Sequence, residues 1–240
     1  LSIDNSSAEN NTTIYAVAES PIDEKLIWVG TDDGLVQVTT NQGTAWSNVT
    51  KNIAGLPAGN WCSYVEPGHH DRNVAYVTFD NHRNGDMKTY IYKTTDMGAT
   101  WTSLATTETE GHAYVIREDL KNPNLLFVGT EFGLYVSIDG GKKWNRFENN
   151  LPKVAVHDMV IHPKEDALVL ATHGRGIYII DDITPLRQIT PEVLTKTFHF
   201  LETKPTILSE VGGSTRNPSP GDDVFYGENP NPLPRIVDYM

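Results

Sequence analysis

Short apolar runs without a helical period alternate with polar turns along most of the chain. Runs rich in valine, isoleucine and aromatic residues, such as "LIWVGT" at 26–31, "VAYVTF" at 74–79 and "LLFVGT" at 125–130, are bounded by Pro, Gly, Asn and Asp. Short β-branched strands separated by such turn residues are typical of antiparallel sheets. The pattern therefore predicts an all-β protein, with four strands in each unit of roughly 40 to 55 residues.

One short motif, [ST]-x-[DN]-x-G-x-x-W, occurs three times where the third strand of a unit must turn back into the fourth. Its copies are Thr39, Asn41, Gly43 and Trp46; Thr94, Asp96, Gly98 and Trp101; and Ser137, Asp139, Gly141 and Trp144. In such a turn the acid or amide accepts backbone N–H groups, glycine supplies a positive φ and tryptophan packs between sheets. A turn repeated in successive units cannot easily be one active site, so we interpret the motif as structural.

A unit of four strands has the size of one β-propeller blade, and four such blades are visible, at about 12–50, 61–104, 112–147 and 155–189. The fourth blade, "AVHDMVIHPKEDALVLATHGRGIYIIDD", keeps three strands and lacks the motif. A stretch rich in Gly, Ser and Pro at 209–223 predicts a flexible linker. We therefore expect blades with a C-terminal extension over 1–208, a linker at 209–223 and the start of another domain at 224–240.

The motif spacing resembles the Asp-box, or bacterial neuraminidase (BNR) repeat, of sialidase-type and sortilin-type propellers. The stretches "IWVGTDDGLVQVT", "NPNLLFVGTEFGLYVSIDGGKKW" and "ATHGRGIYIIDDITPLRQIT" resemble bacterial sortilin N-terminal-like proteins that often carry a glycosyl hydrolase label. The resemblance implies the C-terminal part of an incomplete propeller, followed by a truncated β-sandwich domain that begins in "FYGENPNPLPRIVDYM". It also implies a periplasmic, cell-surface or secreted location, with the targeting signal upstream of Leu1.

The composition narrows the possible partners. The formal charge of −12 argues against nucleic acid, whose binders usually carry a basic face. No apolar run approaches the roughly 20 residues of a membrane helix, so we expect no membrane insertion in this segment. The single cysteine, Cys62, is expected to be a small buried hydrophobe. A glycan, a protein or a peptide remains as the expected ligand.

Function is expected on the face opposite the motif turns, where the loops from second to third strand meet the starts of the innermost strands. The ligand-binding candidates there are Asp80, His82, Arg83, His112, His157, His173 and Arg175, with Trp61 and Asp158 beside them. His173 and Arg175 of "HGRG" either bind a carboxylate or close their own loop by hydrogen bonds. No histidine pair has helix or zinc-finger spacing, so we expect no metal and no cofactor.

Glycoside hydrolysis would need two carboxyl groups flanking the scissile bond. Asp32, Asp33 and Glu131 are the catalytic candidates, although Asp-Gly and Glu-x-Gly after a strand are also common turn chemistry. Three hypotheses follow: a protein- or glycan-binding scaffold module, a carbohydrate-active hydrolase, or a non-catalytic factor that helps assemble membrane complexes. The first is favoured, because every specific sequence feature is structural and no acid pair is fixed by its spacing.

Overall fold

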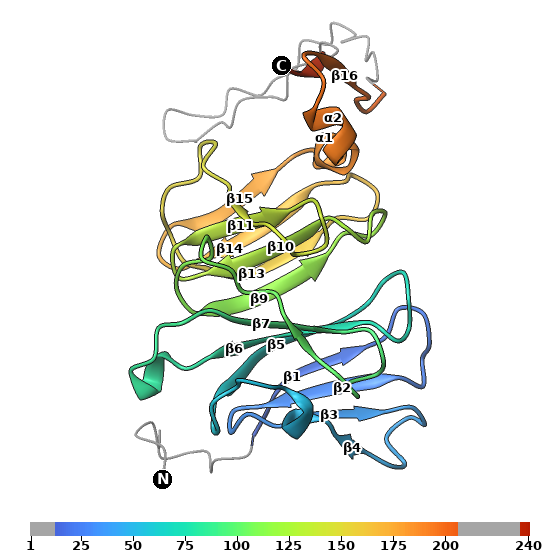
Figure 1. Ribbon diagram of the computed structural model, residues 1–240, viewed down its shortest axis with the longest axis vertical. Helices are drawn as coiled ribbons and strands as arrows, with labels where there is room; N and C mark the ends of the chain where they lie inside the picture. Colours follow the sequence, from blue (N-terminus) through green and yellow to red (C-terminus); the bar gives the residue numbers. More distant parts are fainter. Residues whose placement is uncertain (1–12, 206–235) are drawn as a thin grey trace, which may run out of the picture.

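Strands dominate the computed structural model, which describes residues 13–205 and 236–240 (Figure 1). Within these residues three sheets have four strands, one sheet has three, and a separate pair of strands follows. The linker predicted at 209–223 lies outside the described residues, as do residues 224–235 of the segment expected to open another domain. In Figure 1 the first sheet lies at the bottom, the second lies above it, and the third and fourth sheets overlap in the upper half of the picture.

The first sheet contains β1 (Ile14–Glu19), β2 (Ile27–Thr31), β3 (Val36–Thr39) and β4 (Ser47–Asn48). The second contains β5 (Trp61–Pro67), β6 (Ala75–Asp80), β7 (Tyr90–Thr94) and β8 (Thr102–Ser103). The third contains β9 (Ala113–Glu118), β10 (Leu126–Thr130), β11 (Gly133–Ser137) and β12 (Asn145–Arg146), and the fourth contains β13 (Val156–Ile161), β14 (Leu168–Thr172) and β15 (Gly176–Ile180). Two short 3₁₀ helices, η1 (Thr50–Asn52) and η2 (His82–Asn84), interrupt the loops.

Each sheet is an antiparallel meander in which strands consecutive in sequence are neighbours. The innermost strands β1, β5, β9 and β13 each carry a register shift near their starts, between Cys62 and Tyr64 in β5 for example. A bulge of this kind bends the strand and redirects its side chains. The starts of the innermost strands, where the polar candidates lie, are therefore irregular in all four sheets.

The turn motifs share three hydrogen bonds: hydroxyl to acid or amide, glycine N–H to hydroxyl, and the N–H two residues after the glycine to the acid or amide. In the third copy, Ser137 Oγ donates to Asp139 Oδ1 at 2.8 Å, and the Gly141 N–H donates to Ser137 Oγ at 2.9 Å. Asp139 Oδ1 also accepts the N–H groups of Lys142 and Lys143, both at 3.0 Å. The glycine has φ 90° in this copy and 83° in the other two, a region that side chains disfavour. These bonds fix the chain reversal between β11 and β12.

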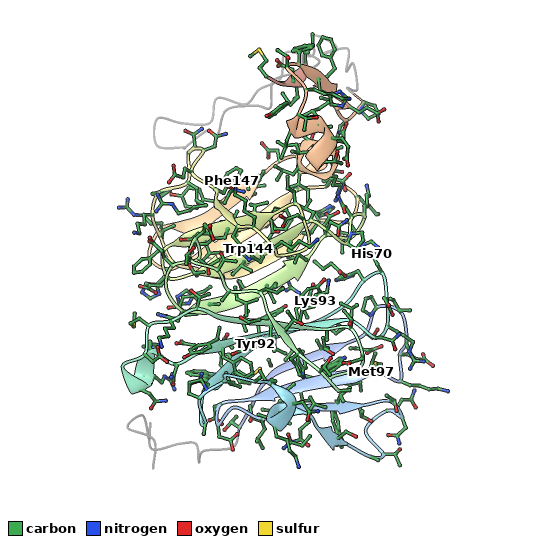
Figure 2. The ribbon with its side chains drawn as sticks, in the orientation of Figure 1. His70, Tyr92, Lys93, Met97, Trp144 and Phe147 are labelled. Carbon is green, nitrogen blue, oxygen red and sulfur yellow. The ribbon has the colours of Figure 1, made fainter. Side chains whose placement is uncertain are left out.

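The hydrophobic cores lie between neighbouring sheets. One cluster joins the first and second sheets, another joins the second and third, and another joins the third and fourth. Trp144 of the third turn motif is only 1% exposed, and its Nε1 donates to the Leu104 carbonyl of the preceding blade at 2.8 Å (Figure 2). A Cβ atom on Gly141 would approach a Leu104 methyl group to 2.9 Å, so glycine is also needed for this close approach.

The first motif departs from the expectation that its tryptophan packs between sheets. Trp101 and Trp144 are 9% and 1% exposed, whereas Trp46 is 42% exposed. Ile14 and Val17 of β1 are exposed too, as are Ile177 and Ile179 of β15. The described residues therefore leave the outer faces of the first and fourth sheets uncovered, and Trp46 has no preceding sheet to pack against.

A charged clamp holds the C-terminal extension to the blades. The extension contains α1 (Thr184–Gln188), α2 (Pro191–Leu194) and the strand pair β16 (His199–Leu201) and β17 (Val237–Tyr239). Arg187 of α1 donates two hydrogen bonds of 2.8 Å to the buried carboxylate of Asp119, and a third of 2.7 Å to Asp166. Bidentate pairing of this kind fixes the orientation of both groups. No helix in the described part of the chain is long and apolar enough to cross a membrane.

Candidate functional site

The strand register places the polar candidates at the end of the sheets opposite the motif turns. Trp61, the first residue of β5, pairs with Asp80, the last residue of β6. At the other end of the same sheet Ala75 pairs with Thr94, which opens the second turn motif. In the figures η2 lies at the left of the second sheet, whereas Met97 of that motif and His70 lie at the right. We call the end that carries Asp80 the upper face.

A row of rings crosses the upper face from the first sheet to the fourth. We define this aromatic row as Tyr15, Trp61, His82, His112, Tyr114, His157 and His173. Neighbouring ring centroids lie 4.4 Å apart for Tyr15 and Trp61, 4.7 Å for His82 and His112, 4.8 Å for His112 and Tyr114, 4.1 Å for Tyr114 and His157, and 5.1 Å for His157 and His173. Arg83 lies over the Trp61 ring at 3.7 Å and so links the two halves of the row. The row includes rings from four separate sheets.

Asp80 and His82 form a tight pair at the centre of the row. Asp80 is buried at the end of β6, and His82 opens η2 two residues later. His82 Nδ1 lies 2.7 Å from both carboxylate oxygens of Asp80, and the His82 backbone N–H donates to Asp80 Oδ1 at 2.9 Å. The short loop thus determines where the imidazole lies. His112, from the next sheet, stacks on His82 and places its Nε2 3.9 Å from Asp80 Oδ2.

The Tyr114 hydroxyl connects His112 to Glu131. It donates to Glu131 Oε2 at 2.7 Å and lies 2.8 Å from His112 Nε2. Since the hydroxyl has one proton, His112 Nε2–H must donate to the Tyr114 oxygen, which leaves Nδ1 of neutral His112 as a bare acceptor. That Nδ1 is buried and has no hydrogen-bond partner among the described residues. Burial lowers the pKa of His112, although the nearby Asp80 carboxylate opposes the change.

Glu131 and Asp80 are the two carboxylates nearest the centre of the row. Glu131 Oε2 lies 3.6 Å from His112 Nε2, and Asp80 Oδ2 lies 3.9 Å from the same atom. Asp80 Oδ2 and Glu131 Oε2 can therefore be no farther apart than the sum of their distances to His112 Nε2. Their separation stays below the upper end of the roughly 5 to 9.5 Å range of glycoside hydrolase carboxyl pairs.

The other catalytic candidates, Asp32 and Asp33, stabilise their own blade. Asp32 Oδ1 accepts the Thr13 N–H at 2.8 Å, and Asp33 accepts the hydroxyl of Thr31 through a short hydrogen bond. Both contacts are typical turn chemistry next to a strand. The structure thus brings Glu131 close to Asp80, and it engages Asp32 and Asp33 within the first sheet.

The remaining candidates divide between the row and its surroundings. His157 lies in the row, and burial followed by the neighbouring His173 lowers its pKa. Arg175 is exposed in the loop between β14 and β15, where Thr172 Oγ1 donates to the Gly176 carbonyl at 2.6 Å. Asp158 lies near Arg117, with a closest N to O distance of 3.7 Å.

Two members of the row, Tyr15 and Tyr114, were not among the candidates from the sequence. Each is the second residue of an innermost strand, where tyrosine also fits a buried sheet position. The register shifts near the strand starts turn these side chains toward the upper face. A systematic search of the first two positions of every innermost strand would have found them.

A second polar cluster lies at the opposite end, between the second and third sheets. Glu66 and Glu118 are buried there; Arg117 donates to Glu66 at 2.7 Å, and the Tyr76 hydroxyl donates to Glu118 at 2.8 Å. His69 Nε2 lies 3.1 Å from Glu66, and this hydrogen bond raises the pKa of His69. Because each buried acid has partners, we assign this cluster to the contact between the sheets.

No protein-family model and no curated protein matches the sequence. Solved structures do resemble it. A GH74 enzyme of Niastella koreensis gives a TM-score of 0.54 at 19% identity over 73% of this chain, and the GH74 xyloglucanase of Xanthomonas campestris gives 0.51 at 19% over 70%. YCF48 from Cyanidioschyzon merolae gives 0.51 at 15% over 70%. The fold is that of β-propeller blades.

At these identities the similarity concerns the fold alone. The chain spans 24% of the Niastella enzyme, 29% of the xyloglucanase and 53% of YCF48. Two of the matched proteins are named as GH74 enzymes and the third as YCF48. The function of this chain has to be argued from the groups on its upper face.

Proposed function

We propose that the chain is part of an Asp-box propeller of the sortilin-like kind, and that it binds a glycan or a peptide on the upper face. The aromatic row is the observation that supports this proposal. It lines up rings from four sheets beside the Asp80 and Glu131 carboxylates, and all of them except the buried His112 are exposed or half-buried. In the proposed setting the propeller is an extracytoplasmic binding module of a larger protein.

The row offers the groups that an extended, largely neutral ligand needs. Ring faces pack against the C–H faces of a sugar or against apolar side chains, and the edge-to-face ring pairs hold the platform rigid. The carboxylates of Asp80 and Glu131 accept hydrogen bonds from hydroxyl or amide groups. Arg83 and Arg175 add positive charge to a chain whose formal charge is −12. This mixture favours a polar, uncharged or weakly acidic ligand.

The carboxylates of the upper face are already hydrogen-bonded to neighbouring groups, which favours ligand binding over catalysis as the first proposal. Asp80 is paired with His82, Glu131 accepts the Tyr114 hydroxyl, and Asp32 and Asp33 hold their own turns. A general acid or base must be able to reach the atom it protonates or deprotonates. Carboxylates that already orient neighbouring side chains are better suited to recognition.

Glycan and peptide arrays, followed by calorimetry on the best ligand, test the binding proposal. Trp61→Ala and His157→Ala remove rings from separate sheets of the row, and we expect each to weaken binding by about tenfold, since ring contacts contribute about 0.5–1.5 kcal/mol beyond buried area. Trp46→Ala is the matched control, because Trp46 is an exposed tryptophan at the opposite end of the first sheet. Equal losses in all three variants, or no loss in the row variants, would refute the proposal.

A glycoside hydrolase is the second candidate, favoured by the positions of Asp80 and Glu131. The two acids come from different sheets, and both lie within 4 Å of His112 Nε2. Release of reducing sugar from polysaccharides would test it, with Asp80→Asn and Glu131→Gln as variants. Activity lost in both variants with ligand binding retained would establish hydrolysis. Activity retained in both would exclude this pair.

A further inference from the structure

We propose that Asp80, His82 and His112 form a binding site for a divalent transition metal ion of the Zn²⁺ type on the upper face. Each residue offers one ligand atom, and these three atoms all lie within 4.8 Å of one another. The inference is independent of the proposed binding of a glycan or peptide, because it rests on these three side chains alone. It also reverses the expectation, drawn from histidine spacing, that the chain holds no metal.

The cluster is already close to the size of a zinc site. Zn–N and Zn–O bonds of about 2.0–2.1 Å place two ligands of a tetrahedral ion roughly 3.4 Å apart, so the widest separation must shrink by no more than about 1.4 Å. Asp80 is buried and fixed by its hydrogen bond from the His82 backbone, and His112 is buried between neighbouring rings. His82 is the member with room to move, because its side chain is 41% exposed.

Binding requires one defined movement. An imidazole lone pair lies in the plane of its ring, and the rings of His82 and His112 are stacked with planes only 25° apart. Two parallel stacked rings cannot both direct a lone pair at the same ion. His82 must therefore rotate out of the stack, and the ion replaces the proton that His82 now shares with Asp80. The metal would thus connect the second and third sheets through the upper face.

His112 is not fully satisfied by protein contacts. Its Nε2 donates to the Tyr114 oxygen, while its Nδ1 is buried with no hydrogen-bond partner in the described part of the chain. A buried polar atom without a partner is uncommon and calls for an explanation. The nitrogen of His112 that lies near Asp80, at 3.9 Å, is Nε2. Zinc binding at Nε2 therefore moves its proton to the unpartnered Nδ1 and replaces the hydrogen bond to the Tyr114 oxygen.

The donor set selects the class of metal. Two imidazoles and one carboxylate suit Zn²⁺ and its neighbours Co²⁺, Ni²⁺ and Cu²⁺ better than the oxygen-loving Ca²⁺ and Mg²⁺. Three protein ligands also leave a tetrahedral ion one open position. Glu131 Oε2, which lies 3.6 Å from His112 Nε2, is a further carboxylate close to the cluster. An oxygen of a ligand lying on the row could occupy it instead.

The test is metal uptake by the full chain without a histidine tag. Equilibrium dialysis against micromolar ZnCl₂ at pH 7.5, with elemental analysis, should give one zinc ion per chain, and Co²⁺ should give the intense visible bands of a tetrahedral site. His82→Ala and Asp80→Asn should each weaken zinc binding at least about 100-fold. Loss of a residue that only orients a metal ligand costs up to about 100-fold, so a larger effect indicates loss of a ligand itself. His173→Ala, which removes another exposed imidazole of the row, should leave uptake unchanged.

Circular dichroism of each variant shows whether it is folded, and exposed His82 can be replaced without leaving a cavity in the core. No stoichiometric zinc uptake by the unaltered chain would overturn the proposal. So would uptake that survives in His82→Ala, or that is lost in His173→Ala, because either result would place the ion elsewhere. Loss of zinc binding with array binding retained would separate this site from the proposed function.

Discussion

Trp144 and Trp46 occupy the same position of the same turn motif, yet they should differ greatly in their effect on stability. Trp144 is 1% exposed and donates to the Leu104 carbonyl, whereas Trp46 is 42% exposed. A buried tryptophan removes about 200 Å² from water, which at about 25 cal/mol per Å² corresponds to about 5 kcal/mol. Large-to-small substitutions of buried aromatic residues cost about 3–5 kcal/mol. We expect that range for Trp144→Ala and less than about 1 kcal/mol for Trp46→Ala.

Urea unfolding followed by far-UV circular dichroism measures both effects without relying on tryptophan fluorescence, which the substitutions themselves change. Trp144→Phe separates the contributions at this position, because it keeps an aromatic ring and leaves the Leu104 carbonyl without its partner, at a cost of about 1–3 kcal/mol. Trp101, which is 9% exposed, should fall between the extremes. Similar losses for Trp144→Ala and Trp46→Ala would show that the motif stabilises each turn locally, and the reasoning from packing between sheets would be wrong.

Three further predictions concern single side chains. Asp139→Ala should cost about 1–3 kcal/mol in urea unfolding, because it leaves turn N–H groups unpaired, and ligand affinity should not change; an affinity loss without a stability loss would contradict this. Burial raises the pKa of Cys62 to about 12, so a thiol reagent at pH 8 should label the chain in urea and not when folded. The Glu66 hydrogen bond raises the pKa of His69, so its stabilisation is complete below about pH 6.5 and is lost as the pH rises through the raised pKa. His69→Gln should remove that loss above about pH 6.5 in urea unfolding, and identical profiles of stability against pH for the two proteins would argue against the assignment.

The strands and their ends could be predicted from the sequence, because the information is local. The turn motif spans eight residues, and its hydroxyl, acid and glycine bond to one another within the same turn. The pairing of Asp80 with His82 is local in the same way. Once the motif defines one end of a blade, the opposite end follows from the antiparallel order of the strands.

The contacts between blades could not be predicted in this way. Asp80 meets His112 only because the second and third sheets pack at a particular offset, and no spacing in the sequence encodes that offset. Arg187 finds Asp119 across 68 positions for the same reason. Trp46 looks identical to Trp144 in its motif, and only the sheet beside it decides whether it is buried. The order of strands predicts which residues lie at the upper end of each sheet, but it does not predict which of them touch.

The placement of the hydrophobic cores between sheets has a consequence for how the chain unfolds. Within residues 13–205 and 236–240, each of the two middle sheets contributes to two interfaces, whereas the first and fourth sheets contribute to one each. The stability of each sheet then depends on its interfaces with the neighbouring sheets, as in repeat proteins. We therefore expect structure to be lost from the end sheets first. Amide hydrogen exchange should therefore be slowest in β6 and β10 and fastest in β1 and β15. The proposed metal cluster joins the two sheets that open last.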